Sequence, residues 1–285
     1  LPEDETIHTI VQDPVKKDLL FVGTEFGAYF TIDGGKIWTE LSAGIPDIAV
    51  KDLVIQEREI DLVAATFGRG FYIIDNYSPL RKLTPEALDT SKAILFPVKD
   101  ALMYVQSGGR YGQGSTYFTA DNPEFGAIFT YYLSEVPKTK KQKRLKKEKE
   151  LLTEREPTPQ HTSEHLREEE KEVPPVLVFT IKDKDGNIVR KLYESPSKGI
   201  KRTAWNLRYQ GKNPVRLRND KFDPKSEGSS GMYALPGTYF VTMSMDHNGD
   251  ITKLAGPVEF TAKPLKNVTL PAPDREALVA YQDKV

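Results

Sequence analysis

Three residues near the middle of the chain have the types and the spacing of a zinc-dependent hydrolytic site. The stretch HTSEH places His161, Glu164 and His165 in an H-x-x-E-H pattern, in which two imidazoles can ligate zinc while the carboxylate acts as a base. Such a site also needs a buried helix and a third ligand, whereas this stretch follows the polar sequence EPTPQ and has no apolar face. We therefore interpret the match as coincidence and predict no metal site and no catalytic residue here.

A second group of residues could act on a carbohydrate. Glycoside hydrolysis needs two carboxylates at a defined distance, or a tyrosine nucleophile. Glu25, Asp61 and Arg69 are the plausible contributors, and Glu25 and Arg69 lie next to turns between expected strands. Arg69 stands between two glycines in FGRG, where it could bind an anionic group, although a solvated arginine in a turn is the simpler interpretation. Glu25 and Arg69 are candidate binding residues, and no residue is predicted to be catalytic.

Asp33 raises the same question, because the stretch TIDGGKIW surrounds its carboxylate with two glycines and a tryptophan. It could be a catalytic acid in a glycine-rich loop. Gly34 and Gly35, however, can adopt positive φ angles, and the carboxylate can accept N–H bonds that a tight turn leaves unpaired. Trp38 can pack its indole against a neighbouring strand. We predict that Asp33 holds a hairpin turn and has a structural role.

Two other segments could bind ions but have simpler explanations. The glycine-rich stretch that begins at residue 107, SGGRYGQG, has neither the strand, the helix nor the lysine that a phosphate-binding loop requires. Asp183 and Asp185 could ligate calcium, but two carboxylates are too few and the sequence favours a turn. We predict no cofactor.

The composition of the chain excludes several classes of protein. Its 40 basic and 41 acidic residues give a net charge of −1, so no global field attracts nucleic acid or an anionic membrane. The absence of cysteine excludes disulfides and thiol catalysis. No apolar run approaches the roughly 20 residues of a spanning helix, so we predict no membrane span.

A charged insertion occupies residues 137–175. Its first arm, residues 138–150, is strongly basic, and its end, EHLREEEKE, is mainly acidic. We predict a solvated helical hairpin or a disordered loop, whose two arms can pair with each other. The basic arm lacks interleaved aromatic residues and its charge is cancelled nearby, so nucleic acid is not a predicted partner.

The first part of the chain contains a repeat. Residues 19–33, LLFVGTEFGAYFTID, align with residues 61–75, DLVAATFGRGFYIID, at a constant offset of 42. The first unit predicts short strands near residues 9–12, 19–23, 28–32 and 37–41. Four strands in about 42 residues is the size of one β-propeller blade.

The hairpin residues Thr31, Asp33, Gly35 and Trp38 carry a resemblance to a known family. They match the Asp-box, or BNR repeat, with Ile37 in place of the usual threonine, and residues 6–83 resemble the closing blades of sortilin-like propellers of bacterial cell envelopes. The resemblance implies a structural Asp-box and two propeller blades over residues 1–83. Two blades cannot close a ring, so we expect the remaining blades in the same longer chain or in another chain.

The rest of the chain is predicted to hold a second β-domain. Residues 84–117 are interpreted as a linker and a glycine-rich loop, residues 118–265 as a β-sandwich, and residues 266–285 as the start of a C-terminal helix. The sandwich resembles Ig-like or fibronectin-type domains, which implies that Trp205 and Tyr239 are core residues. The predicted fold class is all-β: two blades of a propeller, followed by an Ig-like sandwich with a charged helical or disordered insertion.

These expectations lead to two functional hypotheses. The first is a non-catalytic binding or structural component that engages a protein or glycan partner. The second is a fragment of a glycoside hydrolase, sialidase-like or endo-glucanase-like, with its catalytic residues mostly outside this segment. The family resemblance implies a secreted, periplasmic or cell-surface location in either case.

Overall fold

A computed structural model describes residues 1, 4–42, 44–104, 106, 120–212, 223–226, 228–265, 274–282 and 284. The chain forms two compact units, Leu1–Ser91 and Lys92–Val285. Strands make up 42% of the chain and helices 17%, which confirms the predicted β-rich class. Among the described residues, none of the helices is both long and apolar enough to span a membrane.

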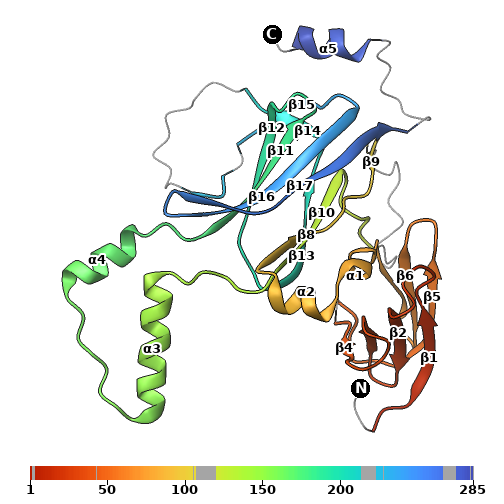
Figure 1. The fold of residues 1–285 in the computed structure, drawn as a ribbon, viewed down its shortest axis with the longest axis horizontal. Helices are drawn as coiled ribbons and strands as arrows, with labels where there is room; N and C mark the ends of the chain where they lie inside the picture. Colours follow the sequence, from red (N-terminus) through yellow and green to blue (C-terminus); the bar gives the residue numbers. More distant parts are fainter. Residues whose placement is uncertain are drawn as a thin grey trace, which may run out of the picture. The chain divides into compact units, whose positions relative to one another are not determined.

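The first unit begins with a four-stranded antiparallel sheet, the first sheet, in the order β1-β2-β3-β4 (Figure 1). Its strands are β1 (Ile7–Gln12), β2 (Leu20–Thr24), β3 (Ala28–Thr31) and β4 (Thr39–Glu40). All four strands predicted from the first repeat are therefore present, although the return strand is shorter than residues 37–41.

The second repeat forms a three-stranded antiparallel sheet, the second sheet, in the order β5-β6-β7. Its strands are β5 (Val50–Gln56), β6 (Asp61–Thr66) and β7 (Gly70–Ile74). Residues 44–104 are all described and contain no return strand that would match β4. Pro79 instead begins the short helix α1 (Pro79–Lys82), because a proline is well suited to the first helical turn and cannot donate to a strand ladder. Helix α2 (Pro85–Thr90) follows.

The two sheets of the first unit share a core. Phe21 of β2 is fully buried and meets the ring of Tyr77 edge-on, with 5.0 Å between the ring centroids. Gly23 lies so close to β5 that a Cβ atom there would stand 2.7 Å from the carbonyl oxygen of Val50. The close approach of β2 to β5 therefore requires glycine at this position.

The buried carboxylate of Asp13, which follows β1, contacts side chains near the end of the first unit. Asp13 is fully buried after β1 and accepts hydrogen bonds from Arg81 Nη2 at 2.8 Å and Tyr77 Oη at 2.6 Å. The backbone N–H groups of Val15 and Lys16 donate to it as well. Burial on its own raises the pKa of Asp13, but these hydrogen bonds outweigh burial and hold the pKa below its usual range.

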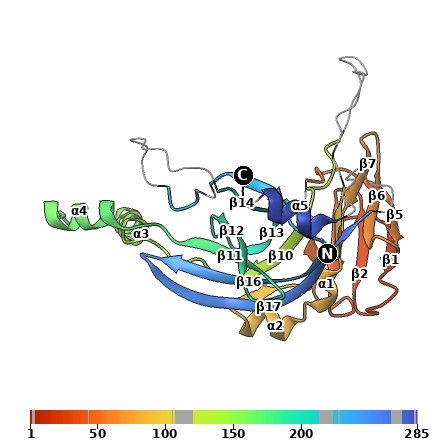
Figure 2. The same cartoon turned by 90° about the horizontal axis from the view of Figure 1, so that it is seen from above.

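The second unit is built on two larger sheets, ordered β13-β10-β8 and β12-β11-β16-β17-β9, with a small β14-β15 pair. Figure 2 shows the two longest strands, β16 and β17, running side by side. The strands are β8 (Ala93–Leu95), β9 (Ala101–Met103), β10 (Ala127–Leu133), β11 (Val176–Asp183), β12 (Ile188–Glu194), β13 (Gly199–Trp205), β14 (Arg208–Gln210), β15 (Ser230–Tyr233), β16 (Gly237–His247) and β17 (Asp250–Pro264).

Aromatic side chains fill the core of the second unit. Trp205 meets Tyr239 at 5.1 Å and Phe260 at 6.1 Å between ring centroids, and Phe129 stacks on Phe179. Both Trp205 and Tyr239 are buried, which confirms that they are core residues.

Two strands of this unit lie in the segment interpreted as a linker, residues 84–117. Strand β8 pairs with β10, and β9 pairs in parallel with β17, whereas the other described strand pairs are antiparallel. Phe96, next to β8, is fully buried. The first unit ends at Ser91, so the second unit begins to form sheet soon after that residue. The glycine-rich part of the predicted segment 84–117, from residue 107 to residue 117, lies outside the described residues.

The charged insertion, residues 137–175, takes the helical form of its two predicted alternatives. It contains α3 (Lys140–Glu154) and α4 (Ser163–Lys171). Near the C-terminus, α5 (Arg275–Gln282) is capped by Asp274 Oδ1, which accepts the N–H of Ala277 at 2.8 Å. The predicted C-terminal helix is therefore present.

Candidate functional site

The Asp33 carboxylate holds the β3–β4 hairpin turn. Its Oδ1 atom accepts hydrogen bonds from Thr31 Oγ1 at 2.7 Å and from the backbone N–H groups of Lys36 and Ile37 at 3.0 and 3.1 Å. The Thr31 hydroxyl and these N–H groups lower the pKa of Asp33. Thr31 Oγ1 also accepts the N–H of Gly35 at 3.1 Å. This arrangement binds the chain to itself and keeps the carboxylate ionised, which suits a turn better than a general acid.

The two glycines of this turn have the backbone geometry that the sequence requires. Gly34 and Gly35 have φ angles of 76° and 99°, a region that residues with a side chain rarely adopt. Gly35 lies under Trp38, since a Cβ atom there would stand 3.7 Å from the indole ring. Thr31, Asp33, Gly35 and Trp38 therefore form one compact hairpin.

Glu25 forms an ion pair inside the first unit. Its Oε2 atom lies 3.0 Å from His8 Nε2, and Lys51 Nζ lies 2.9 Å from the same ring nitrogen. A single nitrogen can donate to Glu25 or accept from Lys51, but not both. The trio joins the β2–β3 loop, β1 and β5, so the Glu25 side chain already has a partner within the first unit.

Arg69 lies in the β6–β7 loop, the counterpart of the loop that holds Glu25. It is exposed between Gly68 and Gly70, whose φ angles are 76° and 74°. Within the described residues, no hydrogen bond or ion pair joins Arg69 to Glu25. Asp61, the other candidate carboxylate, accepts the N–H of Asn76 at 2.8 Å. The three residues proposed for carbohydrate chemistry are thus held apart in different local roles.

The structure reveals an open apolar face on the second sheet. Val54, Val63 and Ile73 are paired across β5, β6 and β7 and form a single row, which we call the open row. Val54 is 55% exposed and Ile73 58% exposed, and Phe71 beside them on the same face is 74% exposed. In β7 the side chains of both faces are apolar, Phe71 and Ile73 on this face and Tyr72 and Ile74 on the other, and this run is a sequence signal that could have identified the face.

The central residue of the open row has a buried counterpart in the first sheet. Val11, Phe21 and Phe30 are paired across β1, β2 and β3 in the same way, and Val63 aligns with Phe21 at the repeat offset. Phe21 lies on the face of the first sheet that packs against the second sheet, as the close approach of Gly23 to β5 shows. The central position of the row is therefore fully buried in one repeat and only partly buried in the next.

The residues of the H-x-x-E-H pattern are engaged with other partners. His161 Nε2 lies 2.8 Å from Glu148 Oε1, and His165 Nδ1 lies 3.6 Å from Glu169 Oε1. Glu164 belongs to the first turn of α4. In the described part of the chain, no group of three or more histidine and carboxylate side chains is arranged to hold a metal ion.

Comparisons of this chain with protein-family models, with curated proteins and with solved structures found no match. Two features of the described residues bear on function: the open row of the second sheet and the charged helical insertion.

Proposed function

We propose that this protein is a non-catalytic binding or structural component, in which the first unit contributes two blades to a sortilin-like BNR propeller and the second unit is an Ig-like sandwich. It engages a protein or glycan partner at a secreted, periplasmic or cell-surface location. The observation that carries the proposal is the uncovered row of Val54, Val63 and Ile73. A face of this kind on a sheet is normally packed against another layer.

The repeat indicates how that face is covered. The first sheet buries Phe21 against the second sheet, and the open row occupies the equivalent position one repeat later. A further sheet can pack on the open row as the second sheet packs on the first. Such a sheet belongs to the same longer chain or to another chain, as in a closed propeller.

The hairpin and the loops support the same proposal. The contacts of Asp33 are those of a structural turn, which is the role that an Asp-box resemblance implies. Arg69 remains exposed at a loop tip, where a cation can contact an anionic group of a partner. Glu25 can bind a group of a partner only if it loses its contact with His8.

A glycoside hydrolase remains the alternative function. It needs two carboxylates that face one pocket. Glu25 and Asp61 are the only candidates from the two sheets, and each is engaged in a local contact with His8 or with the backbone of Asn76. We therefore prefer the non-catalytic binding role to a glycoside hydrolase.

Two assays on the purified chain test the proposal. In the first, a panel of glycosides is incubated with the chain and with its Glu25→Gln and Asp61→Asn variants, and we expect no turnover that depends on either carboxylate. Hydrolysis that either variant abolishes would contradict the non-catalytic role.

The second assay measures the binding of an apolar fluorescent dye. We expect the Phe71→Ser/Ile73→Thr variant to bind clearly less dye than the parent chain, because it removes the most exposed apolar side chains of the face. The matched control is Ile188→Thr/Ile251→Thr, which changes two exposed isoleucines of the sandwich. Equal losses of dye binding in both variants would show that the dye binds the open face no better than other exposed apolar residues.

A further inference from the structure

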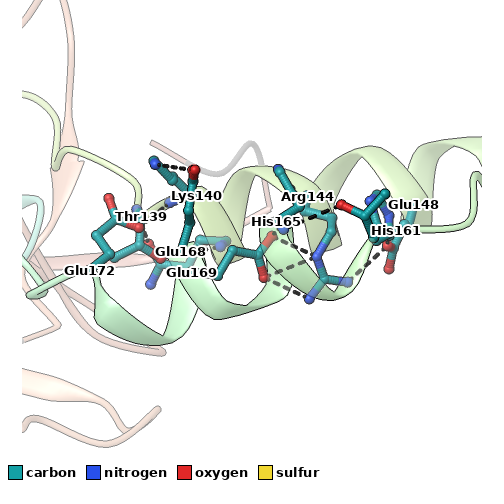
Figure 3. Close-up of polar contacts among 11 residues, drawn as sticks. Thr139, Lys140, Arg144, Glu148, His161, His165, Glu168, Glu169 and Glu172 are labelled. Atoms are coloured by element: carbon teal, nitrogen blue, oxygen red, sulfur yellow. Dashed lines mark hydrogen bonds and ion pairs between the residues drawn. The ribbon is translucent and has the colours of Figure 1, made fainter.

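Helices α3 and α4 are joined by a network of charged groups (Figure 3). Arg144 Nε and Nη2 donate to the Glu169 carboxylate at 2.8 and 2.9 Å, and Arg144 Nη1 donates to Glu148 at 2.8 Å. Lys140 Nζ donates to Glu168 at 2.9 Å. This confirms that the basic and acidic arms of the insertion pair with each other. The carboxylates of Glu169 and Glu148 raise the pKa of Arg144, and the Arg144 guanidinium lowers the pKa of Glu169, so these groups stay ionised at neutral pH.

The network leaves a cleft of about 380 Å³ between the helices, which we call the α3–α4 cleft. Its lining consists of four cations, one carboxylate, two imidazoles and a proline: Lys140, Lys143, Arg144, Lys147, Glu148, His161, His165 and Pro159. The volume exceeds that of one tetrahedral oxyanion, and it lies within the range of ordinary small-molecule sites. The cleft can therefore hold an anion together with part of the molecule that carries it.

Two of the lining cations are not neutralised by the network. Among the described residues, neither Lys143 nor Lys147 forms an ion pair, whereas Lys140 and Arg144 are paired with carboxylates. Lys143 and Lys147 are four residues apart on one face of α3, an arrangement in which like charges destabilise a helix. An anion between their ammonium groups would remove this repulsion.

The two imidazoles add donors to the same cleft. The rings of His161 and His165 are stacked, with 5.5 Å between their centroids. Each ring approaches a carboxylate through one nitrogen, and the other nitrogens, His161 Nδ1 and His165 Nε2, have no hydrogen-bond partner in the described part of the chain. A protonated imidazole donates from both nitrogens. These rings can thus hold a glutamate on one side and an anion on the other.

We propose that the α3–α4 cleft binds a tetrahedral oxyanion carried by a small molecule, either the dianion of a phosphate monoester or the monoanion of a sulfate ester. Lys143 and Lys147 supply the charge, and the imidazoles of His161 and His165 supply directed donors. Pro159 offers an apolar contact for the carrier. This site is separate from the open row and does not depend on the proposed role of the second sheet.

The proposal is tested by NMR on the full chain, which has only four histidines, so that each ring signal can be followed. Inorganic sulfate and inorganic phosphate are added against sodium chloride at matched ionic strength. We expect the signals of His161 and His165 to shift and to saturate with a millimolar dissociation constant, whereas those of His8 and His247 do not. Shifts that follow ionic strength alone would overturn the proposal.

A matched pair of variants locates the binding. We expect Lys143→Ala/Lys147→Ala to weaken binding roughly tenfold, because it removes both uncompensated charges. The control, Lys141→Ala/Lys149→Ala, removes the same charge from α3 residues outside the cleft lining, and its affinity should stay within about twofold of the parent chain. Equal losses of affinity in the two double variants would mean that anions bind to the lysines of α3 in general, as a polyanion does. That result would refute specific binding in the α3–α4 cleft.

The pH dependence tests the role of the imidazoles, and sulfate is the probe because it stays dianionic. The network groups beside these rings are Arg144, Glu148, Glu168 and Glu169, whose pKa shifts keep them charged in this range. The other charged groups that line the cleft with the rings are Lys140, Lys143 and Lys147. Histidine gains a proton as the pH falls from about 7.5 to about 5.5, so sulfate should bind several-fold more tightly at the lower value. Tighter binding that survives in the chain with both His161 and His165 changed to Asn would contradict this role.

Sugar phosphates and sugar sulfates distinguish the two sources of the anion. Glucose 6-phosphate and glucose 6-sulfate are titrated beside the inorganic ions. We expect at least one ester to bind more tightly than its free ion, because the cleft is larger than the anion. Binding of the free ions alone, with both esters excluded, would contradict a carried anion.

Discussion

Arg81 and Asp13 form a buried, charge-assisted contact between residues 68 positions apart in the sequence. Arg81 Nε lies 3.1 and 2.9 Å from the two carboxylate oxygens, and Nη2 lies 2.8 Å from Oδ2. Because Asp13 follows β1 and Arg81 lies on α1, this contact closes the first unit around its two sheets.

Removing one partner of this contact should destabilise the first unit strongly. In Asp13→Asn the guanidinium of Arg81 loses its counter-ion in a largely buried place, and the expected cost is about 3 kcal/mol. Urea denaturation of the chain measures it. Asp89→Asn, which changes an exposed carboxylate on α2, is the control and should change stability by less than about 0.5 kcal/mol. Similar losses in the two variants would contradict the assigned role of Asp13.

The same contact should make the first unit sensitive to acid. The pKa of Asp13 is lower in the folded chain than in the unfolded chain, so its contribution is complete above the unfolded value of about 4. The contribution is lost as the pH falls through the lower, folded pKa. The difference in urea midpoint between the parent chain and Asp13→Asn should therefore be full at pH 7 and should shrink at strongly acidic pH. A difference that grows in acid would contradict the lowered pKa.

Two glycines, Gly23 in β2 and Gly27 in the β2–β3 loop, should differ in the cost of replacement by alanine. Gly23→Ala places a methyl group 2.7 Å from the Val50 carbonyl and 2.8 Å from the side chains of Val50 and Thr9. We expect a loss of about 2 kcal/mol or more, because the two sheets must move apart. Gly27→Ala meets no atom within 4 Å and should cost much less. Thermal unfolding compares them, and equal costs would refute the close packing of β2 on β5.

The contact between α3 and α4 in the insertion should depend on one buried glutamate, Glu169. Glu169→Gln removes the charge that binds Arg144, while Glu170→Gln changes its exposed neighbour. We expect trypsin to cleave α3 several-fold faster in the first variant, because separated helices expose their lysines and arginines more often. Unchanged cleavage of the Glu169→Gln chain would show that the network does not hold the helices together.

Local patterns in the sequence predicted much of the secondary structure. The 42-residue repeat predicted the strands of both sheets, and the opposite charges of the two arms predicted the α3–α4 pairing. Trp205 and Tyr239 were placed in the core through a family resemblance, and both are buried. These features depend on residues close in sequence or on a repeated pattern.

Contacts between distant residues could not be predicted in this way. Nothing near Asp13 indicates Arg81, because the contact exists only after the sheets have packed. The return strand missing from the second sheet depends on Pro79, which begins a helix at the position equivalent to Ile37, just before β4 in the first repeat. Strands β8 and β9 are three residues long, too short for a periodic signal.

The central claim is that the open row packs against another sheet, and crosslinking in the organism that makes the protein tests it most directly. A photo-crosslinking amino acid replaces Phe71, and another replaces Ile188 on β12 of the second unit as the control, since both side chains are exposed. The account predicts that position 71 captures a β-strand peptide with the pattern of residues 19–33 and 61–75, and that position 188 does not. Capture of no such peptide at position 71, or of the same peptides at both positions, would contradict it.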